Sequence, residues 1–289
     1  MKQLVVIVGP TASGKTAAAI QLARQLETEI ISCDSRQFYK ELNIGVARPS
    51  TEELSAAKHH FIACRSVTEP YNVYDYEHDA LAVLDTLFLA HDTVVAVGGS
   101  GLYIDALCKG INQMPDPTPQ LRAELSSKIA EGKFDEMLEE LKRLDPDYYA
   151  IVDRRNPIRI QRALEAIYTS GKKYSDLIGK ELPQRPFSIV KIGINCERHE
   201  LKDRINRRVD LMMDAGLREE AASLLPHRNL NTLNTVGYKE LFNYFDGKQS
   251  LEKAVIEIKN HTWQYAKKQL TWLKRYGEIV WKERKEQLI

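Results

Sequence analysis

The stretch LVVIVGPTASGKT, residues 4–16, decides the fold of this chain. Its first five residues form an apolar run typical of a buried strand, and residues 17–26 predict a helix. Between them lies the pattern GxxxxGK(S/T), in which backbone N–H groups and a lysine surround an anion at a helix N-terminus. We interpret it as a P-loop that binds a phosphate or diphosphate, rather than a glycine-rich turn that only packs strand on helix. The candidate diphosphate-binding residues are Gly9, Pro10, Thr11, Ala12, Ser13, Gly14, Lys15 and Thr16, and the Thr16 hydroxyl is the candidate Mg²⁺ ligand.

The composition is that of an ordinary globular protein. The 289 residues are 43% hydrophobic, so the chain can bury one large domain or one domain carrying an insertion. No apolar run approaches the ~20 residues of a membrane span, and we expect a cytoplasmic protein without a membrane partner. The spacing of the four cysteines suggests neither a zinc site nor a disulfide framework. Lys and Arg total 41 against 40 Asp and Glu, so any nucleic-acid surface must be local.

Further strands are predicted at residues 29–33, 93–97 and 188–194. The first ends at Asp34, and the second runs into the loop GGSGLY, residues 98–103. In open parallel sheets ligands bind beyond the carboxyl ends of the strands, so the P-loop, Asp34 and the glycine loop are expected to line one pocket. We therefore predict an α/β fold of the P-loop NTPase type, a parallel sheet flanked by helices, formed by residues 1–112 and 187–289.

Residues 113–186 change to a helical pattern between two proline-rich segments, which predicts a helical insertion domain. Asn156 is a good N-cap and Gly171 a good stop for a helix over residues 157–170. Arg159 and Arg162 would share a face of this helix, close to Arg154 and Arg155. This cationic patch is either an anion-binding surface or solvated surface charge.

The chemistry of the site is expected to differ from that of an ATPase. ATPases and GTPases organise Mg²⁺ with an acid that ends a hydrophobic strand, but residues 93–97 run directly into glycine, and Asp92 lies at the opposite end. Asp34 is the nearest candidate acid and suits a general base that accepts a proton from a bound nucleophile. The alternative is that Asp34 only caps the following turn or anchors Mg²⁺ from a second layer.

The C-terminal part predicts two more helices. Leu201, Ile205, Val209 and Met212 fall at helical spacing among several arginines. The last long helix places a seam at alternating spacings of four and three residues that we expect to be buried. The seam comprises Leu251, Val255, Ile258, Thr262, Tyr265, Gln269 and Trp272, and Lys267 and Lys268 lie outside it.

Five motifs in order resemble the tRNA dimethylallyltransferase (IPP transferase) family almost end to end. They are GPTASGKT (9–16), DSRQFY (34–39), GGSGLY (98–103) and the late pair VGYKE (236–240) and AKKQLTW (266–272), and the match also includes NPIRIQRALE (156–165). The resemblance implies transfer of a dimethylallyl group from dimethylallyl diphosphate to N6 of the adenosine immediately 3′ of the anticodon in tRNA.

The resemblance also implies roles for individual residues. Asp34 would be the general base, Thr16 would orient the amine or the metal, and Arg208 would be a further clamp on the diphosphate. The positions expected to contact tRNA are Asp34, Ser35, Arg36, Gln37, Ser100, Ile158, Arg159, Ile160, Gln161, Arg162 and Lys239, with Lys267 and Lys268 as further candidates. Mg²⁺ is the expected cofactor, tRNA and dimethylallyl diphosphate are the expected partners, and a monomer suffices.

Two positions of the chain depart from the family pattern, and three other functions compete with this interpretation. Val46 and Arg48 replace a threonine and a lysine that are frequent in the family, which leaves the contacts of that loop open. The closest rival is an adenylate dimethylallyltransferase acting on free AMP, ADP or ATP, for which an arginine-rich insertion would be superfluous. A small-molecule kinase or ATP-driven switch would need the missing acid, and a non-catalytic RNA-binding module would leave the P-loop and Asp34 without a role.

Overall fold

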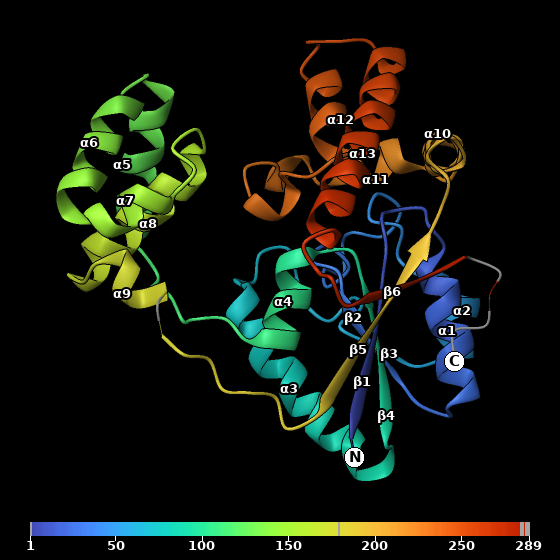
Figure 1. Ribbon diagram of the computed structural model, residues 1–289. Helices are drawn as coiled ribbons and strands as arrows, with labels where there is room; N and C mark the ends of the chain where they lie inside the picture. The colour runs from blue at the N-terminus through green and yellow to red at the C-terminus, as the bar shows by residue number, and fades with distance from the viewer. Residues whose placement is uncertain (1, 179, 284–285, 287–289) are drawn as a thin grey trace. The chain divides into compact units, whose positions relative to one another are not determined.

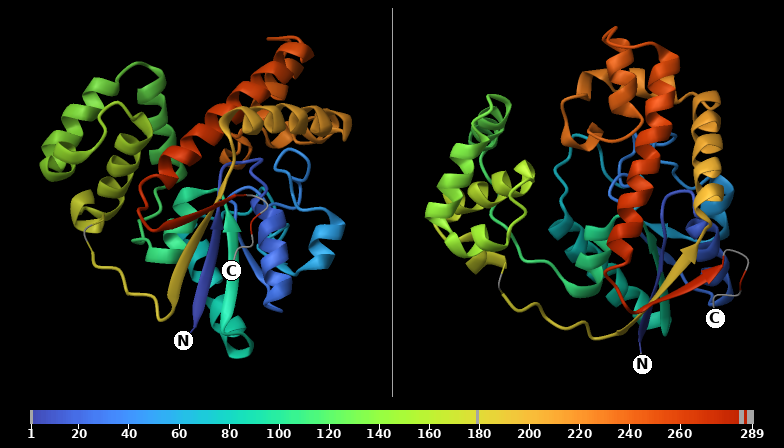
Figure 2. Two further views of the ribbon diagram at one scale, coloured as in Figure 1. Left: turned by 45° about the vertical axis from the view of Figure 1, so that its right-hand side comes forward. Right: turned by 45° about the horizontal axis from the view of Figure 1, so that its top comes forward.

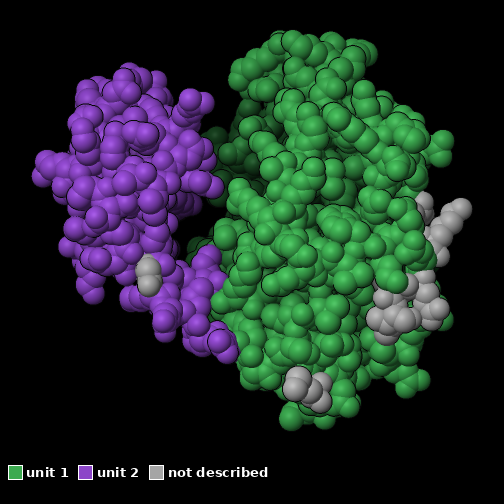
Figure 3. All heavy atoms as spheres, in the orientation of Figure 1, with its two compact units in different colours: residues 1–109, 185–289 green, residues 110–184 purple. Residues whose placement is uncertain are grey.

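A computed structural model describes residues 2–178, 180–283 and 286. The chain divides into two compact units, residues 1–109 with 185–289 and residues 110–184, which Figure 3 colours separately. The first unit is built on a six-stranded, wholly parallel sheet of order β3-β2-β4-β1-β5-β6. The strands are β1 (Gln3–Val8), β2 (Ile30–Cys33), β3 (His59–His60), β4 (Thr93–Gly98), β5 (Ser188–Asn195) and β6 (Ile279–Glu283).

Helices cover both faces of this sheet (Figure 1). They are α1 (Lys15–Gln25) and α2 (Thr51–Ala56) on one side and α3 (Val73–Ala90) and α4 (Gly101–Lys109) on the other. Strand β1 shows why: Val5 and Ile7 join a core cluster with α1, whereas alternate residues such as Val6 join the cluster of α3 and α4. A strand that is buried on both faces gives the continuous apolar run of residues 4–8.

Both views of Figure 2 show the C-terminal helices of the first unit at the carboxyl ends of the strands. They are α10 (Arg198–Asp214), α11 (Leu217–Ser223), the 3₁₀ turns η1 (Leu225–His227) and η2 (Asn231–Leu233), α12 (Tyr238–Phe245) and α13 (Leu251–Leu273). Helices α10 and α13 bury Leu201, Ile205 and Ala266 together, and Ala12 of the P-loop packs against them. The two helices therefore wall the space above the phosphate-binding loop.

The described residues of the second unit, 110–178 and 180–184, form helices joined by loops and no strand. Its helices are α5 (Pro119–Ala130), α6 (Phe134–Leu144), α7 (Pro146–Ile151), α8 (Pro157–Ser170) and α9 (Tyr174–Ile178). It has a core of its own, built on Leu125, Met137, Leu141, Ile160 and Leu164. In neither unit is a described helix long and apolar enough to cross a lipid bilayer.

The predicted α/β class is confirmed, and the four strands expected from the sequence all form. Two strands were missed. Strand β3 has only two residues, and β6 buries only Ile279 while Val280 and Trp281 stay largely exposed. Neither strand therefore shows the apolar run that revealed the other four.

Candidate active site

The P-loop starts where β1 ends. Ala12 and Gly14 adopt left-handed backbone angles, with φ of 64° and 97°, which bend the chain so that α1 begins at Lys15. Ser13 is fully buried, and among the described residues nothing hydrogen-bonds to its Oγ. The loop therefore presents the N-terminus of an eleven-residue helix, with its unpaired N–H groups, beside the side chains of Lys15 and Thr16.

Three basic side chains converge on this loop. The Arg208 guanidinium donates a hydrogen bond to Thr11 Oγ1 (3.1 Å), and Arg204 Nε donates to the carbonyl of Ala12 (2.7 Å). Burial lowers the pKa of Lys15 to about 8; the Asp34 carboxylate opposes this shift and Arg208 adds to it. Burial likewise lowers the pKa of Arg208, against the attraction of Asp34. Partly buried cations of this kind are destabilising until an anion offsets them.

Asp34 follows β2 directly, and its carboxylate attracts the charged side chains of Lys15 and Arg208. Its Oδ1 accepts a hydrogen bond from the backbone N–H of Arg36 (3.0 Å), which is the turn-capping contact considered as the alternative role. The other carboxylate oxygen accepts no hydrogen bond from a described residue. The capping bond thus fixes the orientation of Asp34 and still leaves Oδ2 for a ligand.

The glycine loop after β4 holds Ser35, the residue that follows Asp34. Ser100 Oγ accepts a hydrogen bond from the backbone N–H of Ser35 (3.1 Å). A Cβ at Gly98 would lie 2.4 Å from the carbonyl oxygen of Cys33, so only glycine allows the ends of β4 and β2 to approach this closely. Asp92, at the other end of β4, pairs with Lys2. No acid therefore ends β4 in the position that ATPases use.

Gln269 of α13 ties the P-loop to the glycine loop. Its Oε1 accepts a hydrogen bond from the backbone N–H of Thr11 (2.8 Å), and its Nε2 donates to the carbonyl of Gly99 (2.9 Å). Gln269 is only 6% exposed, as expected of the predicted seam. Tyr265 and Thr262, however, line a cavity, and Tyr265 is 40% exposed, so this part of the seam is not core.

Two cavities of the first unit meet at Asp34. One, of about 560 Å³, is lined by Lys15, Thr16 and the arginines of α10, and the other, of about 640 Å³, extends toward α12. The residues that line both are Thr11, Asp34, Val46, Arg208 and Tyr265. Both volumes fall within the range of small-molecule sites. The arrangement joins a strongly basic chamber to a larger, partly apolar one, with a carboxylate at their junction.

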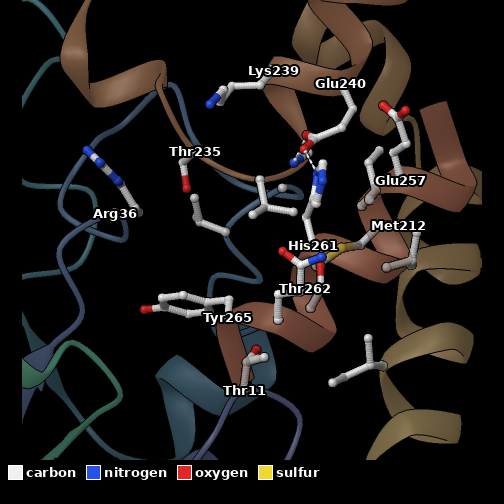
Figure 4. A pocket seen from close by; sticks show the side chains of 18 of the residues that line it. Thr11, Arg36, Met212, Thr235, Lys239, Glu240, Glu257, His261, Thr262 and Tyr265 are labelled. Atoms are coloured by element: carbon white, nitrogen blue, oxygen red, sulfur yellow. Dashed lines mark hydrogen bonds and ion pairs between the residues drawn. The ribbon is translucent and has the colours of Figure 1, made fainter. Parts of the chain in front are cut away.

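The larger cavity ends at a pair of side chains that the sequence did not reveal. His261 of α13 hydrogen-bonds through Nδ1 to Glu240 Oε1 (2.6 Å), as Figure 4 shows. Glu240 lies in the VGYKE motif, but nothing in the sequence connected it with His261, because they come from different helices. Ser35, Arg36 and Lys239 line the same cavity. Lys239 is exposed, so it is available to a ligand.

Gln37 has a different position from Ser35 and Arg36. Its Nε2 donates hydrogen bonds to the carbonyls of Val46 (3.2 Å) and Ala47 (3.0 Å), and it lines only the basic cavity. Ser100 lines neither cavity, and its hydroxyl holds Ser35. Gln37 and Ser100 thus hold the loops next to Asp34, and their expected contact with tRNA stays a prediction.

Val46 and Arg48, the two residues that depart from the family pattern, lie in a loop that several hydrogen bonds fix in place. The guanidinium of Arg48 donates to the carbonyls of Tyr39, Lys40 and Leu42, at 3.3, 2.7 and 2.6 Å. The Glu220 carboxylate of α11 accepts the backbone N–H groups of residues 43–45 and the Tyr238 hydroxyl. All three bonds come from one nitrogen, Nη2, whereas the buried Nε of Arg48 hydrogen-bonds to no described residue, so Arg48 closes the turn through one end of its guanidinium.

Helix α8 of the second unit has the caps that the sequence predicted. Asn156 Oδ1 accepts the N–H of Arg159, and Gly171 ends the helix with φ of 67°. The exposed residues of its first turns and of the preceding turn are Arg154, Arg155, Ile158, Arg159 and Arg162. Arg162 also donates a hydrogen bond to the buried Glu165 (3.0 Å).

Two residues of the same helix are not available to a ligand. Ile160 is 0% exposed in the core of the unit, and the Gln161 amide hydrogen-bonds to Ser126 (3.0 Å) and Glu165 (2.9 Å). The expectation that their side chains contact tRNA is therefore corrected: the helical period turns residues 160 and 161 inward while 158, 159 and 162 face solvent.

Comparison with known proteins agrees with this site. The family model described as IPP transferase matches residues 37–276. The chain belongs to the IPP transferase family. A tRNA dimethylallyltransferase of Christiangramia forsetii is 49% identical over 280 residues, which cover 97% of this chain and 93% of that relative. A tRNA dimethylallyltransferase of Flavobacterium johnsoniae is 47% identical over 287 residues, with the same two coverages.

Solved structures show that this member of the IPP transferase family also shares the fold of its relatives. The full-length tRNA isopentenylpyrophosphate transferase of Bacillus halodurans superposes with a TM-score of 0.72 at 34% identity, covering 98% of this chain and 90% of that one. A eukaryotic dimethylallyltransferase acting on tRNA gives a TM-score of 0.81 at 25% identity, covering 98% of this chain and 74% of that one.

Proposed function

We propose that this protein transfers a dimethylallyl group from dimethylallyl diphosphate to N6 of the adenosine immediately 3′ of the anticodon in tRNA. The observation that carries the proposal is the junction of two cavities at Asp34, one basic enough for a diphosphate and one large enough for an acceptor base. Family membership and the names of the relatives support the same reaction. We further propose that the enzyme acts in the cytoplasm and works as a monomer.

The basic cavity would bind the diphosphate. The N–H groups at the start of α1, the Lys15 ammonium and the Arg208 guanidinium surround the space where the leaving group would lie. As the C1–O bond of the donor breaks, the diphosphate takes the bonding electrons, and these positive groups stabilise the charge that develops. These partly buried cations, destabilised by the loss of water around them, gain most when that charge appears.

The residues present fit a magnesium ion beside the diphosphate. Thr16, the first residue after Lys15 in α1, lines the basic cavity, and Asp34 lines it as well. Mg²⁺ prefers oxygen ligands and commonly binds through one or two protein groups, substrate phosphates and water. When bound there by Thr16, it would supply further charge neutralisation to the departing diphosphate.

Asp34 would act as the general base. The lone pair of the adenine amine is delocalised into the ring, so N6 becomes an adequate nucleophile only as it loses a proton. As N6 bonds to C1 of the donor, its proton passes to the free carboxylate oxygen of Asp34. Ser35 and Arg36, which line the acceptor cavity beside Asp34, would hold the flipped adenine. Apolar lining from Ile205, Val209 and Met212 would accept the five-carbon chain.

The second unit would hold the tRNA through the exposed basic start of α8. Phosphate contacts supply affinity and make it depend on salt. We expect Arg159→Ala combined with Arg162→Ala to weaken tRNA binding and to lower the slope of log affinity against log salt by about 1–2. Affinity for dimethylallyl diphosphate should not change. Arg143→Ala, an exposed arginine on α6 of the same unit, is the control, and equal salt slopes in all three proteins would remove the patch from the proposal.

A transfer assay distinguishes tRNA from the free-nucleotide acceptor of the rival reaction. Radiolabelled dimethylallyl diphosphate and Mg²⁺ are incubated with an adenosine-containing anticodon stem–loop, and in parallel with AMP and ATP. Label should enter the stem–loop alone. Label in AMP or ATP would instead identify an adenylate dimethylallyltransferase, and ATP hydrolysis without transfer would favour a kinase or switch.

A further inference from the structure

Tyr265 lies at the junction of the two cavities, but the reaction described above gives it no role. It is one of the five described residues that line both cavities. The others are Thr11, Asp34, Val46 and Arg208, so Tyr265 alone among the five carries an aromatic ring. Figure 4 shows its side chain reaching from α13 into the acceptor cavity. A ring in this position meets the group that passes from donor to acceptor.

The polar end of Tyr265 is held by the protein. Burial raises the pKa of Tyr265 to about 12, and the nearby Asp34 carboxylate adds to the shift. Hydrogen bonding of its hydroxyl with Ser100 of the glycine loop and with Gln269 of α13 opposes the shift. The side chain therefore stays an uncharged phenol at neutral pH. Because the hydroxyl has partners within the protein, the part of Tyr265 that remains for a ligand is its ring.

The reacting carbon of the donor, C1, has to lie at the same junction. Reacting atoms must approach to about 3–3.5 Å before a bond can form. In the proposed reaction the leaving oxygen lies in the basic cavity with Lys15 and Arg208, and N6 of the acceptor lies beside Asp34. C1 must be within reach of both atoms, so it would lie where Tyr265 lines the passage between them. The adjoining carbons C2 and C3 would then contact the ring.

Positive charge develops on the allyl group during transfer. The electron pair of the breaking C1–O bond goes to the diphosphate, and C1 and C3 share the positive charge until the lone pair of N6 forms the new bond to C1. N6 gives its proton to Asp34. The charged residues of the junction have other tasks, because Lys15 and Arg208 serve the diphosphate and Asp34 must take that proton. An uncharged group that attracts a cation would act on the allyl carbons directly.

We propose that the ring of Tyr265 stabilises the positive charge of the allyl group by a cation–π interaction and is thereby a catalytic residue of the transfer. The negative face of an aromatic ring attracts a cation that lies within about 6 Å of the ring centre. Val46 also offers apolar surface at the junction, but an aliphatic side chain has no such face. The inference rests on the proposed function, because the charge develops only on an allylic donor.

A series of side chains at position 265 separates this role from a structural one. Tyr265→Phe removes the hydroxyl bonds and keeps the aromatic face. Phenylalanines with one, two or five ring fluorines nearly keep the shape and withdraw electrons from that face, and Tyr265→Leu removes the ring. Single-turnover transfer should slow less than about threefold in Tyr265→Phe, further with each set of fluorines, and about tenfold or more with five fluorines or with leucine. The same series at Tyr168, 41% exposed on α8, is the control and should change the rate less than about twofold.

A binding measurement tests the ring without requiring transfer. In 2-(dimethylamino)ethyl diphosphate a protonated amine replaces C3, and 3-methylbutyl diphosphate is its neutral counterpart of similar size. Calorimetric titration gives the ratio of the two affinities, which should fall about fivefold or more from the wild type to Tyr265→Leu and stepwise along the fluorinated series. Equal transfer rates along that series, or an affinity ratio that Tyr265→Leu leaves unchanged, overturns the proposal. A ratio that depends on Tyr265 in a protein that transfers nothing to RNA would reject the proposed function and support the ring contact.

Discussion

The bridge made by Gln269 gives a prediction whose size follows from the structure. Gln269→Met keeps the length and volume of the side chain but removes both hydrogen bonds between α13 and the two loops. It leaves the N–H of Thr11 and the carbonyl of Gly99 without their partners. Each buried group left unsatisfied costs about 1–3 kcal/mol. Because water can reach these part-buried groups, we expect the lower half of the summed range, about 2–4 kcal/mol of the free energy of unfolding.

Urea denaturation followed by circular dichroism measures this loss. Gln21→Met, the same substitution at an exposed position of α1, should change the free energy of unfolding by less than about 0.5 kcal/mol. The affinity for dimethylallyl diphosphate should fall as well, since the Thr11 N–H belongs to the P-loop. A Gln269→Met protein as stable as the control, with unchanged affinity for the donor, would refute the bridging role.

Two further predictions concern the walls of the site. Burial lowers the pKa of Lys15 to about 8, and only the protonated form of Lys15 attracts a diphosphate. Donor affinity should therefore fall as the pH rises through about 8. Calorimetric titration of the wild type should show this pH dependence, and Lys15→Met should bind the donor weakly at every pH. Glu220→Ala removes the carboxylate that accepts the backbone N–H groups of residues 43–45 and the Tyr238 hydroxyl, and should lower the free energy of unfolding by about 2–3 kcal/mol. Glu219→Ala, at an exposed position, is its control. Equal midpoints of urea denaturation for the two variants would contradict the role of Glu220.

Much of the architecture could be predicted because the decisive signals are local. The apolar run of β1 followed by the P-loop specifies strand, turn and helix within about twenty residues, and Asp34 follows the next strand directly. Parallel strands then bring these loops to one edge of the sheet. The caps of α8, Asn156 and Gly171, were likewise legible, because capping depends on the residue itself and its near neighbours.

The remainder depends on contacts between distant segments. Helical spacing marks a face but does not tell whether protein or a cavity covers it, so Tyr265 was expected in the core and lies at the acceptor cavity instead. The family resemblance implied a tRNA contact at Ile160, whose side chain lies in the core of the second unit. The pairing of His261 with Glu240 joins two helices, and no pattern within either helix indicates it.

The most direct test of the central claim compares wild type with Asp34→Asn. The amide keeps an oxygen to accept the N–H of Arg36, so the loop should stay in place while the proton acceptor is lost. Single-turnover transfer from labelled donor to the stem–loop should slow by about 10²–10⁴-fold, with the affinities for dimethylallyl diphosphate and RNA unchanged. Asp85→Asn, an exposed acid on α3, is the control. Transfer by Asp34→Asn at close to the wild-type rate would contradict the account, because the amine would then lose its proton to another group.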